Sequence, residues 1–257
     1  MPGDHDRQQD QQALTTVQRD EDVSKFAQVI AAAFANDTLN RYMFLGRESR
    51  PDHPKLSQTD LRVAFWQPLM ASRFEKGGIL VQTYDWAGVA LWWVTGLVLV
   101  VPLPLPPFHW GNNAWSQMSR LPPGVGKPNP SDSAAGGSGE NPVPEGAAEY
   151  REKFDALKQK YLGGRPHWYL NLIGRLPSRR EEKGAIRGLI EPFLQKACEE
   201  NLPVWLEATN RHAKEVYSYF GFRVAEEVRI GKGVVNAEGW VQADGEGVLL
   251  WGMVAGL

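Results

Sequence analysis

The sequence contains very little cysteine and has no excess of either charge. Its one cysteine, Cys198, excludes an internal disulfide and a multi-cysteine zinc site, and this usage fits a reducing compartment. The 28 Lys and Arg nearly balance the 30 Asp and Glu, which leaves a formal net charge of −2 and no basic footprint for nucleic acid or an anionic membrane. We therefore expect a cytoplasmic protein, monomeric or homodimeric, that binds neither nucleic acid nor a metal.

Signals for membrane targeting or insertion are also weak. Residues 1–21 are polar, lack an apolar h-region, and are expected to form a disordered leader. The uncharged run 87–110 is about as long as a bilayer span, but four prolines in its second half would break a spanning helix. A buried strand followed by an apolar Pro-rich insert over 97–120 is the favoured interpretation, with a membrane-associated chain as the alternative.

The apolar pattern predicts alternating helices and strands. Helical spacing is found over 22–35, 58–76, 150–161, 186–198 and 213–220. Cys198 lies in the apolar stripe of the 186–198 helix and is predicted to pack in the core. Short apolar runs predict six strands, at 79–84, 89–94, 168–173, 204–208, 222–230 and 248–254.

The order of these elements predicts the fold class. Strand, helix, strand and helix follow one another in the C-terminal half, which implies a right-handed crossover between two parallel strands. We expect an α/β fold with a central mixed, mostly antiparallel sheet flanked by helices, in a single domain over 22–257. Residues 121–147, with 6 Pro, 6 Gly and 3 Ser, are expected to form a flexible insert.

One segment carries a family resemblance. Residues 210–222 read N-R-H-A-K-E-V-Y-S-Y-F-G-F, and L-P-V-W-L-E-A-T precedes them. Without the family, this is a strand, a turn and an amphipathic helix that stops at Gly221. The segment resembles the signature N-x-x-A-x-x-x-Y-x-x-x-G-F of the GNAT acetyltransferases at every fixed position, and the preceding strand resembles that of fungal members. The resemblance implies the GNAT fold and an N-acetyltransferase that uses acetyl-CoA to acetylate a small-molecule amine.

The expected cofactor loop departs from the family pattern. In the family, a Gln/Arg-x-x-Gly-x-Gly/Ala turn presents backbone N–H groups to the CoA pyrophosphate at a helix N-terminus. This chain has R-R-E-E-K-G-A-I at 179–186, which fits the pattern in neither register. Glu181 and Glu182 would repel a pyrophosphate unless both side chains point to solvent. The alternative is a catalytically inactive or repurposed GNAT-fold protein that does not use acetyl-CoA.

The resemblance also assigns roles to individual residues. It makes Tyr217 the general acid for the leaving thiolate, because a phenol of pKa about 10 is protonated at neutral pH. Asn171 occupies the strand position where the family often has a Glu, so Glu207 on the neighbouring strand is the named general base, with His167 as a further candidate. The tryptophans of the N-terminal half hint at an apolar or aromatic acceptor pocket. Cofactor contacts are expected from nine residues: Leu172, Ile173, Gly174, Arg179, Arg180, Lys183, Gly184, Ala185 and Asn210.

Overall fold

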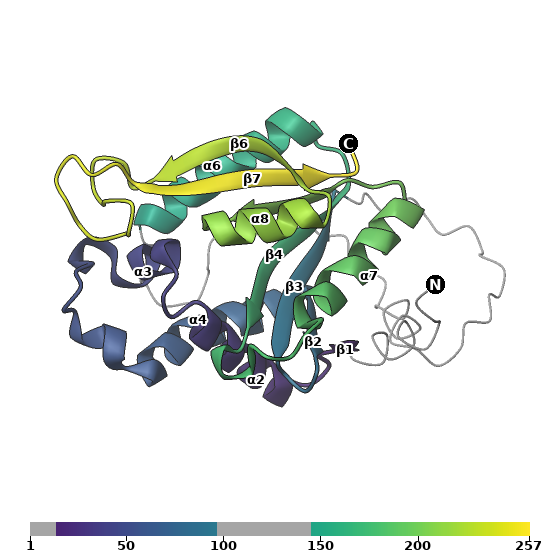
Figure 1. The fold of residues 1–257 in the computed structure, drawn as a ribbon, viewed down its shortest axis with the longest axis horizontal. Coiled ribbons are helices and arrows are strands. Elements are labelled where there is room, and N and C mark those ends of the chain that lie inside the picture. Colours follow the sequence, from purple (N-terminus) through teal and green to yellow (C-terminus); the bar gives the residue numbers. More distant parts are fainter. Residues whose placement is uncertain (1–13, 97–144) are drawn as a thin grey trace.

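A single mixed sheet forms the centre of the molecule (Figure 1). The computed structural model describes residues 14–96 and 145–257. The sheet has seven strands in the order β1-β2-β3-β4-β5-β7-β6, and only β4 and β5 run parallel. The predicted mixed, mostly antiparallel sheet with one parallel pair is thereby confirmed. The strands are β1 (Leu14–Thr16), β2 (Ile79–Thr83), β3 (Gly88–Thr95), β4 (His167–Arg175), β5 (Val204–Ala208), β6 (Arg223–Ile230) and β7 (Val248–Ala255).

The helices flank this sheet at positions close to those predicted from apolar spacing. One helix was not predicted: α3 follows α2 after a short turn, and Asp37 caps it by accepting a hydrogen bond from the Asn40 amide (2.9 Å). Short 3-10 turns lie at 46–48, 54–57 and 177–179. The α-helices are α2 (Asp20–Ala33), α3 (Thr38–Leu45), α4 (Thr59–Glu75), α6 (Glu145–Leu162), α7 (Ala185–Glu199) and α8 (Arg211–Tyr219).

Each face of the sheet carries its own hydrophobic core. Helices α2, α4 and α6 pack on one face around Trp93 and Trp205, whereas α7 and α8 pack on the other around Trp92 and Trp168. Because successive side chains of a strand point to opposite faces, the neighbouring Trp92 and Trp93 of β3 serve different cores. In the α7 core the Trp92 ring stacks on Phe193 with centroids 4.5 Å apart, and its Nε1 donates to the Leu189 carbonyl (3.1 Å).

The prediction that Cys198 packs in the core is wrong. Its side chain is exposed, although Leu189, Phe193 and Ala197 on the same helix are buried. Each step of four residues turns about 40° further around a helix of 3.6 residues per turn. Three such steps from Ile186 carry position 198 off the buried stripe.

Two predicted boundaries also need correction. Residues 14–16, placed in the disordered leader, form the edge strand β1 against β2, and Asp20 already begins α2. Residues 145–147, placed in the flexible insert, form the first turn of α6. The apolar insert at 97–120 and the rest of the 121–147 insert lie outside the described residues. Within the described part, no helix is both long and apolar enough to cross a bilayer.

The α7 core gives a direct stability test. Phe193→Ala should lower the free energy of unfolding by about 3–5 kcal/mol, because it leaves a cavity beneath the Trp92 ring. Tyr219→Ala is the control, since this side chain is 73% exposed, and its effect should stay within about 0.5 kcal/mol. Urea denaturation of both variants measures the difference, and equal losses would contradict this account of the core.

Candidate active site

The parallel strands β4 and β5 separate halfway along their length and leave a cavity between them. Pairing covers only Trp168–Leu170 of β4 and Val204–Leu206 of β5, although β4 continues to Arg175. A bulge in the β3–β4 ladder coincides with this point, since Trp92 pairs with Leu170 and Leu91 with Leu172. Beyond it, β4 residues 171–175 line a cavity of about 1970 Å³.

The other wall of the cavity is set by a close helix–strand contact. A Cβ atom on Gly174 would lie 2.7 Å from the Cβ of Ala33, so only glycine lets the end of α2 approach β4 this closely. The chain then turns from α2 into α3 at Asp37, which also lines the cavity. The α2–α3 turn is thereby held beside the part of β4 that carries the predicted cofactor contacts Ile173 and Gly174.

Tyr217 faces the same cavity from α8. Asn210 caps this helix by accepting a hydrogen bond from the Ala213 amide (2.9 Å), and Tyr217 is 8% exposed. Burial, with the nearby carboxylates of Asp37 and Glu207, raises the pKa of Tyr217 above its usual value. Among the described residues, none forms a hydrogen bond with its hydroxyl. The phenol is therefore protonated at neutral pH and lines a space that a ligand can enter.

Glu207 also lines the cavity, but its carboxylate is already engaged. Oε2 accepts from the hydroxyls of Tyr169 (2.7 Å) and Tyr150 (3.1 Å), and Oε1 accepts from Trp205 Nε1 (2.7 Å). Only 2% of the side chain is exposed, and Lys158 Nζ lies 4.0 Å away. Three donors and a cation satisfy this carboxylate within the fold.

Lys158 keeps its positive charge within this buried cluster. Lys158 forms an ion pair with Asp155 (2.8 Å). Burial alone would lower the pKa of Lys158, but Tyr169, Glu207 and Asp155 together raise it, so the ammonium stays charged. Asn171 at the bulge donates to the Tyr169 hydroxyl (2.9 Å), which links the splayed part of β4 to Glu207.

The predicted cofactor residues fall into two groups. Five of them line the cavity: Leu172, Ile173, Gly174, Arg180 and Asn210. The other four, Arg179, Lys183, Gly184 and Ala185, are not part of its lining. Arg179 donates instead to the Asp85 carbonyl (2.7 Å) and to Glu182 (2.8 Å).

The loop before α7 nevertheless keeps the geometry of an open helix N-terminus. Gly184 precedes the helix at φ +87°, a left-handed conformation that favours glycine, and Ala185 is the first, buried residue of α7. Gly188 is the first residue of α7 whose backbone N–H donates within the helix, to the Gly184 carbonyl (2.8 Å). The N–H groups of the α7 residues before it are therefore available to a ligand or to water. Glu181 is exposed and Glu182 pairs with Arg179, so the two acidic residues of the loop do not line the cavity.

His167, the further candidate for a general base, lies away from the cavity. It is buried at the start of β4, where its ring contacts the Thr95 hydroxyl (2.8 Å) and the Arg165 carbonyl (2.9 Å). Burial lowers the pKa of His167. It is not among the lining residues, so the structure gives it a packing role.

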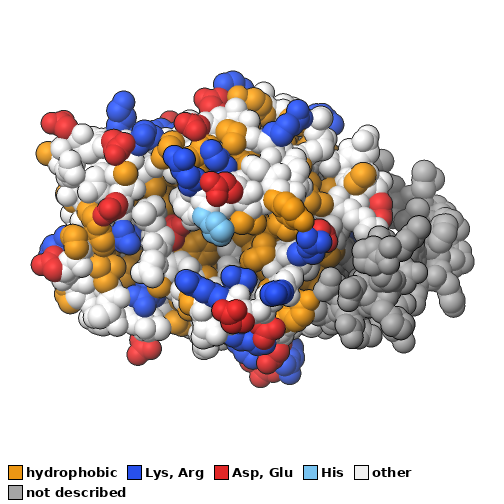
Figure 2. Space-filling view, in the orientation of Figure 1, with side chains coloured by type: hydrophobic (Ala, Val, Ile, Leu, Met, Phe, Trp, Pro, Cys, Tyr) orange, Lys and Arg blue, Asp and Glu red, His pale blue; other side chains and the backbone are white. Residues whose placement is uncertain are grey.

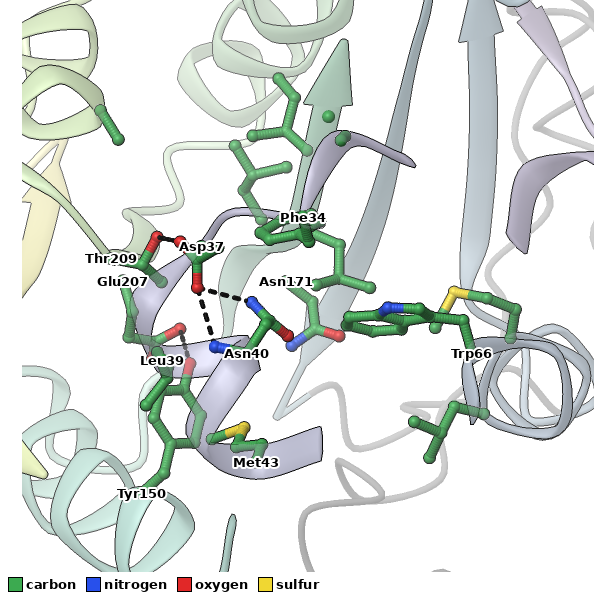
Figure 3. Close-up of a pocket in the computed structure, with 18 of the residues that line it drawn as sticks. Phe34, Asp37, Leu39, Asn40, Met43, Trp66, Tyr150, Asn171, Glu207 and Thr209 are labelled. Atoms are coloured by element: carbon green, nitrogen blue, oxygen red, sulfur yellow. Dashed lines mark hydrogen bonds between the residues drawn. The ribbon is translucent and has the colours of Figure 1, made fainter. Parts of the chain in front are cut away.

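Aromatic side chains of α4 and of the α2–α3 turn, together with Asp37, line one part of the cavity (Figure 3). Phe34 and Trp66 lie 5.7 Å apart between ring centroids, and Phe65 meets Trp66 edge to face at 5.5 Å. Asp37 also lines the cavity, and the Thr209 hydroxyl donates to its Oδ2 (2.6 Å). Sequence reasoning did not identify Asp37, although a helix-capping pattern was present around it.

Cationic side chains outnumber acidic ones around the cavity, although the whole chain is slightly negative. Figure 2 shows Lys and Arg side chains above and below a band of hydrophobic side chains in the middle of one face. The lining includes four acidic residues, Asp37, Glu75, Asp155 and Glu207, and seven basic ones, Lys55, Arg73, Lys76, Arg151, Lys158, Arg175 and Arg180. Such a balance suits an anionic ligand.

Comparison with known proteins agrees with this architecture. No protein-family model matches the sequence. A structure of a mosquito arylalkylamine N-acetyltransferase-like protein 5b superposes with a TM-score of 0.50 and covers 94% of this chain and 97% of its own, at 10% sequence identity. At that identity the likeness shows the fold alone, and the fold is that of the GNAT acetyltransferases.

Two yeast relatives are similar over shorter stretches. The increased recombination centers protein 11 of Saccharomyces cerevisiae is 38% identical over 84 residues, which is 33% of this chain and 54% of that protein. An uncharacterized N-acetyltransferase of Schizosaccharomyces pombe is 37% identical over 70 residues, which is 27% of each chain. This chain thus spans about half, or less, of the length of the curated relatives it matches.

The engaged state of Glu207 predicts a large stability role. Glu207→Ala should lower the free energy of unfolding by about 3–5 kcal/mol, because it leaves Lys158 buried beside unpaired donors. A double-mutant cycle of Glu207→Gln with Lys158→Met should give a coupling energy of about 1–3 kcal/mol in chemical denaturation.

The matched control is the exposed pair of Lys160 and Glu226, which lies 2.6 Å apart on the surface. Water screens this pair, so its cycle should show little coupling. Equal coupling in the two cycles, or an unchanged stability of Glu207→Ala, would contradict the structural role of Glu207.

Proposed function

We propose that this chain is an N-acyltransferase that moves an acetyl group from acetyl-CoA to the amine of a small molecule. The observation that carries the proposal is the separation of β4 from β5 beside the Tyr217 hydroxyl. This hydroxyl has no hydrogen-bond partner in the described fold, and Tyr217 lines the same cavity. The GNAT fold and the name of the Schizosaccharomyces pombe relative, an N-acetyltransferase, support it.

Three features support binding of a CoA thioester. The β5-facing edge of residues 171–175 is no longer paired by β5, so its backbone groups are available to an extended ligand arm. The open N-terminus of α7 offers amides to a phosphate, and Arg180 adds a cation on the cavity side. Neither Glu181 nor Glu182 of the loop lines the cavity, and Glu182 is paired with Arg179.

The chemistry that these residues support is a direct transfer. A neutral amine attacks the thioester carbonyl, and its oxygen gains negative charge near the β4 amides around Ile173 and Gly174. The C–S bond then breaks while Tyr217 donates its phenol proton to the departing sulfur. The proton that the amine loses is relayed by water to the Tyr217 phenolate and restores the phenol. The products are an amide and free CoA.

Glu207 takes a positioning role in this proposal rather than that of a general base. Its three hydrogen bonds and its 2% exposure leave little access for the amine proton. Through Tyr169 it holds Asn171 at the bulge, where the cavity begins. The sequence-based assignment of proton abstraction to Glu207 is therefore not favoured by the geometry.

Substitution of Tyr217 by Phe tests the acid. Turnover of an accepted amine should fall by on the order of 10²-fold, since the leaving thiolate loses its proton donor. The dissociation constant for acetyl-CoA should change little, because the phenyl ring still fills the same space. Steady-state kinetics and calorimetry measure the two quantities.

Tyr161→Phe is the matched control. This residue donates to the Ala225 carbonyl (2.9 Å) from α6 and is not part of the cavity lining. Its turnover should equal that of the unmodified protein. If Tyr217→Phe also retains full turnover, Tyr217 is not the acid.

A further inference from the structure

We infer that the acceptor is an amine with an aromatic or similarly flat apolar arm, whose ammonium group is bound by Asp37 while the arm lies against Phe34, Phe65 and Trp66. This inference rests on the proposed function for its chemistry, but the binding it describes is measurable without acyl transfer. It identifies Asp37 as a specificity-determining residue that lies outside the 210–222 signature.

The aromatic wall has the composition of a site for a flat apolar group. Phe34 directly follows α2, whereas Phe65 and Trp66 lie on α4, and the centroid of the Trp66 ring lies 5.7 Å from that of Phe34 and 5.5 Å from that of Phe65. All three line the cavity, and Phe34 and Phe65 are only half-buried. A ring placed against them gains edge-to-face contacts and buries apolar surface.

Asp37 is the cavity carboxylate best suited to bind a ligand cation. Glu207 and Asp155 are both within 4.0 Å of Lys158, and Glu75 is exposed at the end of α4. No ion pair engages Asp37 within residues 14–96 and 145–257. Arg41, one turn along α3, instead donates to the Glu238 carbonyl (2.6 Å) and stacks on Trp240 (3.9 Å).

The hydrogen bonds of Asp37 fix its position without neutralising its charge. Oδ1 accepts from the amide (2.9 Å) and the side chain (2.8 Å) of Asn40, and Oδ2 accepts from the Thr209 hydroxyl (2.6 Å). All three donors are uncharged, and a carboxylate offers about four acceptor sites. One acceptor site and the full negative charge therefore remain for an ammonium group.

Asp37 is also tied to the segment that leads to Tyr217. Thr209 ends the segment that leads from β5 into α8, the helix that carries Tyr217, and its hydrogen bond ties Asp37 to that turn. Figure 3 shows Asp37 and Thr209 together on one side of the cavity, with Trp66 on the other. An amine held at Asp37 with its arm toward Trp66 would have its nitrogen beside the turn that leads into α8 and Tyr217.

Calorimetry with three probes tests the inference on the full chain, with and without saturating desulfo-CoA. The probes are 2-phenylethylamine, 2-phenylethanol, which lacks the cation, and ethylamine, which lacks the ring. We expect 2-phenylethylamine to bind on the order of 10-fold or more tightly than either partial probe. Equal affinities for the three probes, or tighter binding of ethylamine, would overturn the inference.

Two substitutions separate the contributions of charge and ring. Asp37→Asn keeps an oxygen for the Asn40 amide, so the helix cap persists. It should weaken the binding of 2-phenylethylamine about 10-fold and leave the affinity for 2-phenylethanol unchanged. Trp66→Leu should weaken the binding of both aromatic probes about 5- to 10-fold and leave the affinity for ethylamine unchanged.

Controls protect against loss of folding. Phe65→Leu serves as the second ring variant, because Phe65 is only half-buried and its replacement is milder. Asp52→Asn, at an 83% exposed side chain outside the cavity, should change no affinity. If the Asp37→Asn variant folds normally and binds 2-phenylethylamine with unchanged affinity, the assignment of Asp37 is overturned.

The outcome also separates this inference from the proposed function. Binding of 2-phenylethylamine that depends on Asp37 and Trp66, in a protein that does not bind acetyl-CoA, would support the inference and contradict the acyltransferase. Acetyl transfer from acetyl-CoA to ethylamine with no preference for 2-phenylethylamine would support the acyltransferase and contradict the inference.

Discussion

The separation of β4 from β5 after three paired residues is the constraint on which the rest of the site depends. A parallel pair normally continues as long as both strands do, and here the bulge at Asn171 ends it. Ending the ladder leaves backbone groups of β4 without strand partners, which a folded protein tolerates only where water or a ligand can satisfy them. The cavity is therefore a consequence of how the sheet is built.

The buried charged groups near this opening have partners within the fold. The buried Glu207 carboxylate accepts hydrogen bonds from Tyr150, Tyr169 and Trp205, and Lys158 lies 4.0 Å from it while pairing with Asp155. Such a cluster holds the shape of the cavity, because breaking one member leaves a buried charge unpaired. In the proposed reaction, the chemistry falls to the Tyr217 hydroxyl, which has no hydrogen-bond partner among the described residues, and the ligand cation to Asp37, which has no ion pair there.

Much of the fold could be predicted from the sequence, because periodicity reports directly on burial. The stripe from Ile186 to Ala197 and the strand 204–208 lie where their apolar patterns indicated. Asn210 and Tyr217, the two residues that the N-x-x-A-x-x-x-Y pattern singled out, both line the cavity. Cys198 was misplaced because a helical stripe drifts around its axis, so a spacing pattern alone overcounts buried positions.

The parts of the site that escaped prediction depend on tertiary contacts. Asp37 reads in sequence as a helix stop, and only the folded chain brings Thr209, 172 residues away, to its side. Glu207 reads as a free strand carboxylate until Tyr150 of α6 and Tyr169 of β4 are seen to engage it. No local pattern encodes a bulge that stops one ladder and opens a cavity.

The central claim is that the opened β4–β5 pair binds a CoA thioester. Calorimetric titration with acetyl-CoA and desulfo-CoA tests it most directly, on the unmodified chain and on the loop variants Arg180→Glu and Lys183→Glu. Arg180 lines the cavity and Lys183 does not, so micromolar binding that Arg180→Glu weakens far more than Lys183→Glu is the predicted result. No binding at millimolar cofactor, or equal loss in both variants, would contradict it.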